Sequence, residues 1–70
     1  MVYRIIIKRE SKGYFFGKTF TGKRYKILKN KYSKKFKVGS DFSFYAKEKK
    51  GFLNTILIPI SDEEAGVRML

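Results

Sequence analysis

Apolar and polar residues alternate along short segments of this chain, and glycines separate the segments. Alternation with a period of two places successive side chains on opposite faces of a β-strand. Turns are indicated at Gly13, Gly22, Gly39 and Gly51, because glycine adopts the backbone angles that tight turns need. The stretch 30–37 is lysine-rich and poorly periodic, so it is predicted to be a loop. The predicted strands are residues 2–9, 14–21, 23–29, 41–47 and 52–60.

The length of the chain limits how these strands can be stabilised. Seventy residues make one domain, which buries only about 60% of the surface that the unfolded chain exposes. There is no cysteine and no histidine, so disulfides and the usual structural zinc sites are excluded. Closing a small sheet into a barrel gives one shared interior and removes most of its edges. We therefore predict an all-β fold, a small five-stranded antiparallel β-barrel over residues 1–60.

The interior of this barrel must be filled without tryptophan. About half of the aromatic residues are expected to serve this purpose and to carry no information about a ligand. They are Tyr3, Phe20, Phe36, Phe42, Phe44 and Phe52. The core as a whole is predicted to include Ile5, Ile7, Val38, Phe42, Phe44 and Leu57.

The last ten residues, 61–70, carry the signature of a helix N-terminus. Ser61 is a good N-cap and Glu64 follows three residues later, as in a capping box. We predict a short C-terminal helix here, with a frayed tail as the alternative. Such a helix would cap the barrel or dock the chain onto a larger protein complex.

Positive charge is concentrated in one part of the chain. The net charge is +11, and residues 1–50 hold sixteen lysines and arginines against three carboxylates, a net of +13. Residues 51–70 carry a net charge of −2. A basic body of this kind is typical of proteins that bind polyanions, with RNA or DNA favoured over an anionic membrane. A lysine-rich surface that serves only solubility is the alternative.

Aromatic residues are interleaved with these cations. Eleven of the twelve aromatics lie in the first fifty residues. Tyr14 and Phe16 fall on one face of the second strand, and Tyr25 on the third strand is expected to share that face, with Lys18 beside them. Exposed rings stack on bases and lysines contact phosphates, so this face is predicted to bind a single strand. In the opposite register Tyr14 and Phe16 would face the barrel and Phe15 would face outward.

The lysine-rich stretch after the third strand is the second part of the predicted site. It is expected to clamp a nucleic-acid backbone, with Tyr32 stacking on a base; a solvated, mobile loop is the alternative. The complete set of predicted nucleic-acid-binding residues is Lys12, Tyr14, Phe16, Lys18, Arg24, Tyr25, Lys26, Lys31, Tyr32, Lys34, Lys35 and Tyr45. Few asparagines or glutamines are present to read base edges, so little sequence specificity is expected.

One stretch resembles a known nucleic-acid-binding motif. Lys12-Gly13-Tyr14-Phe15-Phe16 is similar to the first RNA-binding motif of cold-shock domains, Lys-Gly-Phe-Gly-Phe, which lies on the second strand of an OB-type barrel. Residues 24–28 stand where that family has its second motif, and residues 39–44 resemble the start of its fourth strand. The resemblance covers roughly residues 2–58. It implies an OB-like barrel that binds single-stranded RNA or DNA.

A second resemblance is to the small basic SH3-barrel chromatin proteins of thermophilic archaea. It rests on residues 38–45, on a charged glycine turn, and on Ser61, Ala65 and the terminal Met69-Leu70. It implies an SH3-like barrel that coats duplex DNA through the minor groove.

Catalysis is not expected. The six carboxylates show no pairing that suggests acid–base or two-metal chemistry, and Gly13 to Gly17 is too bulky at its centre for a phosphate loop. We predict a non-enzymatic protein with no cofactor and no metal. The longest apolar run, 56–60, is too short to span a bilayer, and residues 1–7 are too short and charged for a signal peptide.

The prediction is therefore a cytoplasmic or nucleoid-associated monomer that binds single-stranded RNA or DNA and no membrane. A duplex-DNA-binding chromatin protein is the first alternative. The second is a basic accessory subunit of a ribosome or polymerase complex, docked through residues 61–70.

Overall fold

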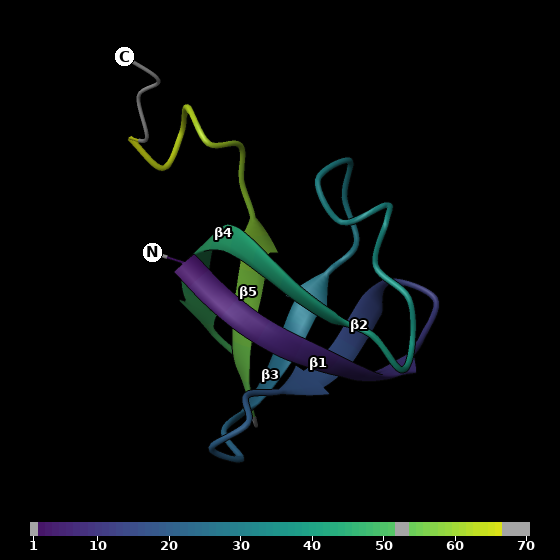
Figure 1. Cartoon of the computed structure of the whole chain (residues 1–70). Helices are drawn as coiled ribbons and strands as arrows, with labels where there is room; N and C mark the ends of the chain where they lie inside the picture. Colours follow the sequence, from purple (N-terminus) through teal and green to yellow (C-terminus); the bar gives the residue numbers. More distant parts are fainter. Residues whose placement is uncertain (1, 52–53, 67–70) are drawn as a thin grey trace.

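Five strands close into a barrel in the computed structural model, which describes residues 2–51 and 54–66 (Figure 1). The order of strands around the barrel is β1-β2-β3-β5-β4, with β4 returning to β1. The predicted all-β class and the five-stranded barrel are confirmed. The strands are β1 (Val2–Glu10), β2 (Tyr14–Lys18), β3 (Arg24–Leu28), β4 (Asp41–Lys50) and β5 (Thr55–Pro59).

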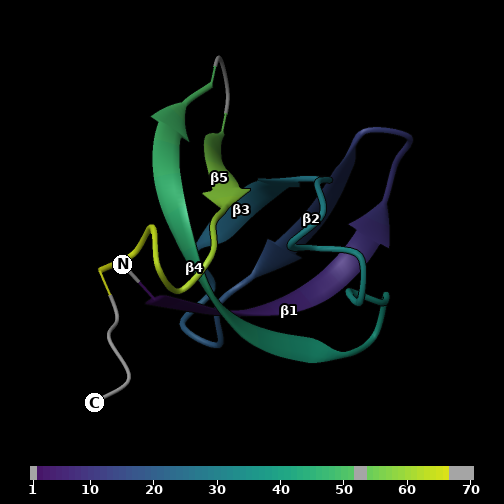
Figure 2. The same cartoon turned by 90° about the horizontal axis from the view of Figure 1, so that it is seen from above.

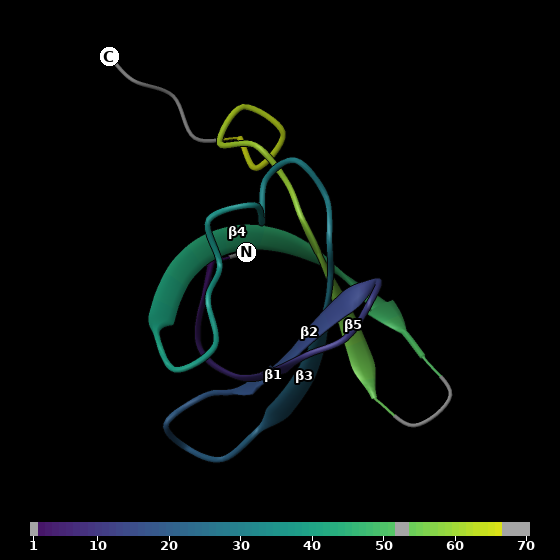
Figure 3. The same ribbon diagram turned by 90° about the vertical axis from the view of Figure 1, so that its right-hand side faces the viewer.

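The two long strands, β1 and β4, pair with a different neighbour along each of their halves. The first half of β1 pairs with β4 and its second half pairs with β2. In the same way β4 pairs first with β1 and then, from Ala46 onward, with β5. A strand whose two halves pair with different neighbours must bend, and Figure 3 shows β4 curving around the barrel. In Figure 2, β1 sweeps across the side opposite β3 and β5.

The prediction of a wholly antiparallel barrel is wrong at one seam. β3 and β5 pair in parallel, from Tyr25 opposite Thr55 to Ile27 opposite Leu57. The reason is the odd number of strands in the closed barrel. β2 and β4 both run antiparallel to β1, so β3 and β5, which are antiparallel to β2 and β4, run in the same direction.

Several strand ends differ from the predicted ones. β2 ends at Lys18 rather than at residue 21, because the following residues form a hydrogen-bonded turn. β4 continues to Lys50 through residues predicted as a turn, held by its pairing with β5. β5 begins at Thr55, and Phe52, predicted as core, lies outside the described residues.

The barrel interior is lined by alternating side chains of all five strands. Ile5, Ile7, Ile27 and Leu57 are fully enclosed. Phe42 is half-buried and packs against this core. The buried apolar set is Tyr3, Ile5, Ile7, Phe15, Tyr25, Ile27, Phe36, Phe44, Ala46 and Leu57.

Two predicted core residues are exposed. Val38 is 51% exposed in the loop before Gly39, and Phe20 is 87% exposed on the turn between β2 and β3. Period-two alternation applies only within a strand, and both residues lie beyond a strand end.

The loop 29–40 is anchored to one end of the barrel. Phe36 inserts between the rings of Phe15, Phe42 and Phe44, with ring centroids 5.7, 4.7 and 4.9 Å away. Asn30 Nδ2 donates to the carbonyl of Pro59 at 2.9 Å. The buried Ser33 hydroxyl lies within hydrogen-bond distance of the Leu28 carbonyl, at 3.2 Å. The lysines of this loop therefore project from a backbone that is held in place.

The described part of the predicted C-terminal helix forms turns only. Ser61 Oγ accepts a hydrogen bond from the Glu64 amide at 3.1 Å, as predicted for an N-cap. One helical turn follows, from the Ala65 amide to the Ser61 carbonyl, and Gly66 then has a φ of 82°. That left-handed angle ends a right-handed helix. The helix is therefore not confirmed, and residues 67–70 lie outside the described residues.

Candidate nucleic-acid interface

Two of the three aromatics of β2, Tyr14 and Phe16, lie on the outside of the barrel. Phe15 is 4% exposed and points into the core, whereas Tyr14 and Phe16 on either side of it are half-buried. The strand register therefore agrees with the outward orientation expected for Tyr14 and Phe16.

The neighbouring strand places different residues beside them than expected. Phe16 pairs with Lys26, Lys18 pairs with Arg24, and Gly17 pairs with Tyr25. Tyr25 is only 6% exposed and meets Tyr3 edge to face with ring centroids 5.4 Å apart. The expectation that Tyr25 shares the outer face is wrong, because Tyr25 lies opposite Gly17 on β2 and both residues face inward. Cations, not a third ring, flank Phe16 on β3.

A bulge in β1 leaves two adjacent cations exposed. Ile7 pairs with Gly17 and Arg9 pairs with Phe16, so Lys8 is an extra residue without a partner on β2. A bulge changes which way the following side chains point. Lys8 and Arg9 are both exposed, although strict alternation would turn Arg9 inward after Ile7. Neither residue belongs to the predicted site.

Cations lie directly over the exposed rings. The Arg9 guanidinium carbon is 4.4 Å from the centroid of Phe16, and Lys26 Nζ is 4.1 Å from that of Tyr14. Lys26 Nζ is also 5.8 Å from the centroid of Phe16. Such contacts are worth about 0.5–1 kcal/mol each at exposed sites, little enough for a stronger ligand to displace them.

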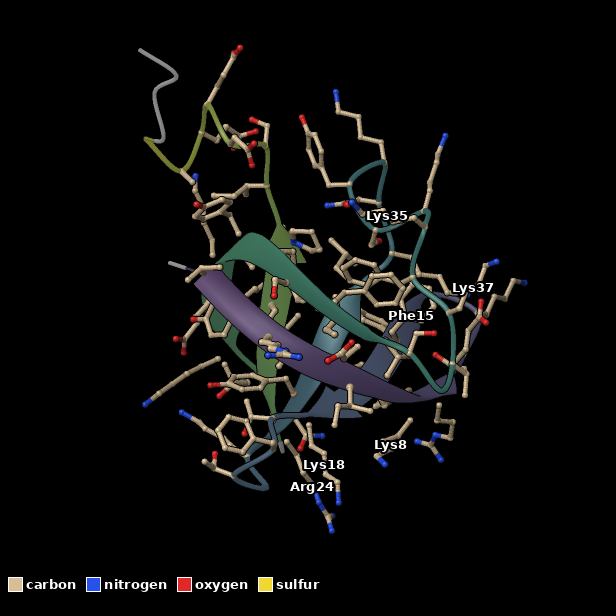
Figure 4. The ribbon with its side chains drawn as sticks, in the orientation of Figure 1. Lys8, Phe15, Lys18, Arg24, Lys35 and Lys37 are labelled. Atoms are coloured by element: carbon tan, nitrogen blue, oxygen red, sulfur yellow. The ribbon has the colours of Figure 1, made fainter. Side chains whose placement is uncertain are left out.

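Of these residues, Arg9 and Phe16 border a groove of about 570 Å³, whose lining comes from β1, β2 and β3 and from Asn54. None of the described residues lining it carries a carboxylate. Figure 4 shows Lys8, Lys18 and Arg24 gathered at the same end of the barrel. The residues that line the groove are Lys8, Arg9, Phe16, Gly17, Lys18, Arg24, Tyr25 and Asn54.

Few of the cations are neutralised internally. The described residues include sixteen lysines and arginines, and only three of these have a carboxylate oxygen within 4.0 Å in that part of the chain. The three are Arg4, Lys29 and Lys47. Hydrogen bonding to the Tyr25 side chain raises the pKa of Lys23, which precedes Arg24 of the groove. The groove thus combines unneutralised positive charge with an apolar ring.

The remaining predicted residues are divided between other places. Lys12 is exposed on the turn between β1 and β2. Tyr32, Lys35 and Tyr45 line a separate hollow of about 480 Å³ beside Ser61 and Asp62. Lys31 and Lys34 are exposed on the loop 29–40. In Figure 4, Lys35 and Lys37 lie at the opposite end of the barrel from Lys18 and Arg24. The predicted residues therefore do not form one continuous site.

The residues at or near the groove that are not part of the predicted site include Lys8, Arg9 and Phe20. The outward orientation of Arg9 beside Lys8 depends on the bulge, for which two adjacent basic residues after an isoleucine run are only a weak signal. Phe20 is predicted to lie in the core because the predicted second strand runs to residue 21, whereas β2 ends at Lys18. The sequence Thr19-Phe20-Thr21-Gly22 does carry a signal, since a turn before glycine exposes its side chains.

The described residues contain no cluster of three or more potential metal-binding histidine, cysteine or carboxylate side chains, and no helix that is long and apolar enough to cross a membrane. Comparison with family models, with curated proteins and with solved structures finds no match to this chain.

Proposed function

We propose that this protein binds single-stranded RNA or DNA across the outer face of β2 and β3. The observation that carries the proposal is the groove in which Lys8, Lys18 and Arg24 surround Phe16 without a carboxylate. Phosphates attract the cations, and the flat ring offers a surface on which any base can stack.

The topology supports an OB-like barrel over an SH3-like one. The strand order β1-β2-β3-β5-β4 with a parallel β3–β5 seam brings β1, β2 and β3 together as one continuous outer surface. In OB-folds this β2–β3 surface and its adjoining loops bind oligonucleotides. The outward Tyr14 and Phe16 also occupy the strand on which the resemblance to cold-shock domains places stacking rings.

Binding would exchange one set of contacts for another. A base stacking on Phe16 or Tyr14 takes the place of Arg9 or Lys26 over the ring, and the released cation is then free to contact a phosphate. Each stacked base contributes about 1–3 kcal/mol, which exceeds the cation–π contact that it replaces. In the free protein, Arg9 and Lys26 therefore cover the rings of Phe16 and Tyr14, and a bound strand displaces them.

Sequence preference is expected to be weak. Asn30 is engaged with Pro59 and with the Tyr32 amide, so its side chain is not free to read a base. Asn54 is the one asparagine or glutamine among the described residues that line the groove. Backbone contacts and stacking carry little information about sequence.

The direct test is titration of one labelled sequence as single-stranded RNA, single-stranded DNA and duplex at fixed salt. We expect single strands to bind more tightly than the duplex. The double variant Tyr14→Ala with Phe16→Ala should lose single-strand affinity about 30-fold or more while remaining folded. Lys47→Gln, which alters a cation paired with Glu64 away from the groove, is the matched control. Tighter binding to duplex would contradict the proposal and favour a chromatin function.

A further inference from the structure

The turn between β2 and β3 holds an aromatic side chain out in solvent. Phe20 is 87% exposed, the most exposed large apolar side chain among the described residues. Its backbone is well defined: the Thr19 amide donates to the Lys23 carbonyl at 2.9 Å, and the Gly22 amide donates to the Thr19 carbonyl at 2.9 Å. Gly22 has a φ of 93°, which closes the turn in a conformation that favours glycine. Binding of a ligand to this ring therefore requires little additional ordering of the backbone.

Phe20 forms one wall of a hollow of about 290 Å³ on the outside of β1. Ile6 and the ion pair of Arg4 with Asp41 complete its lining. Arg4 Nε and Nη2 both donate to Oδ2 of Asp41, at 3.1 and 2.9 Å. The hollow thus has an aromatic ring, an aliphatic side chain and a polar rim whose carboxylate charge is balanced by Arg4.

The hollow adjoins the groove through Lys18. Lys18 lines the groove and pairs across the sheet with Ile6, which lines the hollow. Lys23 and Arg24 follow the same turn, and both are exposed. A strand that leaves Phe16 would pass Lys18 and then meet Phe20. The positive charge around the ring favours an anionic ligand over an apolar protein surface.

We propose that Phe20 and Ile6 form a subsite for one nucleobase of the bound strand, adjacent to the groove. The base stacks on the Phe20 ring, Ile6 contacts its edge, and Lys18 with Arg24 holds the neighbouring phosphates. The subsite rests on the proposed single-strand function and extends it beyond the β2–β3 face to the outside of β1. It also gives a role to an exposed ring that the barrel core does not use.

The test uses the full chain with Phe20→Trp. The chain has no tryptophan of its own, so tryptophan emission excited beyond the absorption of its tyrosines reports position 20 alone. We expect quenching on addition of a short single-stranded oligonucleotide, because a stacked base quenches indole emission. In parallel, anisotropy of the labelled oligonucleotide gives the affinity of each variant. Phe20→Ala should weaken binding about 5- to 100-fold, and Phe20→Trp should retain it.

Val38→Ala is the matched control, because Val38 is 51% exposed and lines neither the groove nor either of the two hollows. Its affinity should equal that of the wild type. If Phe20→Ala binds the oligonucleotide like the wild type and the tryptophan is not quenched, the subsite is wrong while the proposed function stands. If the wild type binds no single strand, the proposed function fails and the subsite with it. A blue shift with phosphatidylserine vesicles, without quenching by oligonucleotide, would overturn the proposal in favour of a lipid surface.

Discussion

At the scale of single residues, Gly17 shows how closely β1 and β2 approach. A Cβ atom at Gly17 would lie 2.4 Å from Cγ2 of Ile5 and 2.6 Å from the carbonyl oxygen of Ile6. The second contact is with backbone, which cannot move away without disturbing the sheet. We expect Gly17→Ala to lower the free energy of unfolding by about 1–3 kcal/mol, measured by urea denaturation.

Gly13→Ala is the control for this prediction. A Cβ atom there would have no neighbour within 4 Å, so the change in free energy of unfolding should stay within about 0.5 kcal/mol. Equal effects of the two substitutions would show that the close approach at Gly17 has no energetic importance.

Tyr3 carries a second prediction at this scale. Burial, and then the hydrogen bond and negative charge of Glu48, raise the pKa of Tyr3 well above its usual value near 10.0. Because the folded state binds this proton more tightly than the unfolded state, the resulting stability is complete below pH 10 and falls as the pH rises beyond it. Tyr3→Phe removes this titration. The difference in free energy of unfolding between wild type and variant should therefore shrink as the pH rises from about 9 to about 11. Urea unfolding at steps of about one pH unit on either side of the usual tyrosine pKa measures this difference.

Glu48→Gln separates the two causes of this shift. It removes the charge but leaves Tyr3 buried, so its alkaline loss of stability should be smaller than that of the wild type and larger than that of Tyr3→Phe. A wild type and a Tyr3→Phe variant that lose stability in parallel above pH 10 would contradict the assignment.

At the scale of elements, the loop 29–40 contributes one side chain, Phe36, to the core. Phe36 is 4% exposed and contacts three other rings. Its loss in Phe36→Ala should cost about 3–5 kcal/mol, a large share of the stability of so small a domain. Phe36→Leu keeps most of the apolar volume and should cost less. Thermal unfolding followed by circular dichroism measures the stability of both variants. Lys35→Ala, at an exposed position of the same loop, is the control and should change the free energy of unfolding by no more than about 0.5 kcal/mol.

At the scale of the whole molecule, the basic surface predicts a steep salt dependence. Single-strand affinity should fall linearly with the logarithm of salt concentration, with a slope of about −0.7 for each phosphate contacted. Replacing Lys18 and Arg24 together by glutamine should therefore reduce the magnitude of the slope by about 1.4. Lys47→Gln should leave it unchanged. An unchanged slope in the double variant would place the phosphates elsewhere, for example at the loop 29–40.

The fold class and the chemistry of the surface could be predicted from the amino-acid sequence alone. Alternation, glycine turns and the lack of cysteine are local or compositional properties, and they sufficed to predict a five-stranded barrel with Tyr14 and Phe16 outward on β2. The tertiary structure alone decided which residues join them. Pairing with Gly17 turned Tyr25 inward, the bulge turned Arg9 outward beside Lys8, and the early end of β2 exposed Phe20. Register, bulges and strand ends depend on contacts between distant segments, so no local pattern determines them.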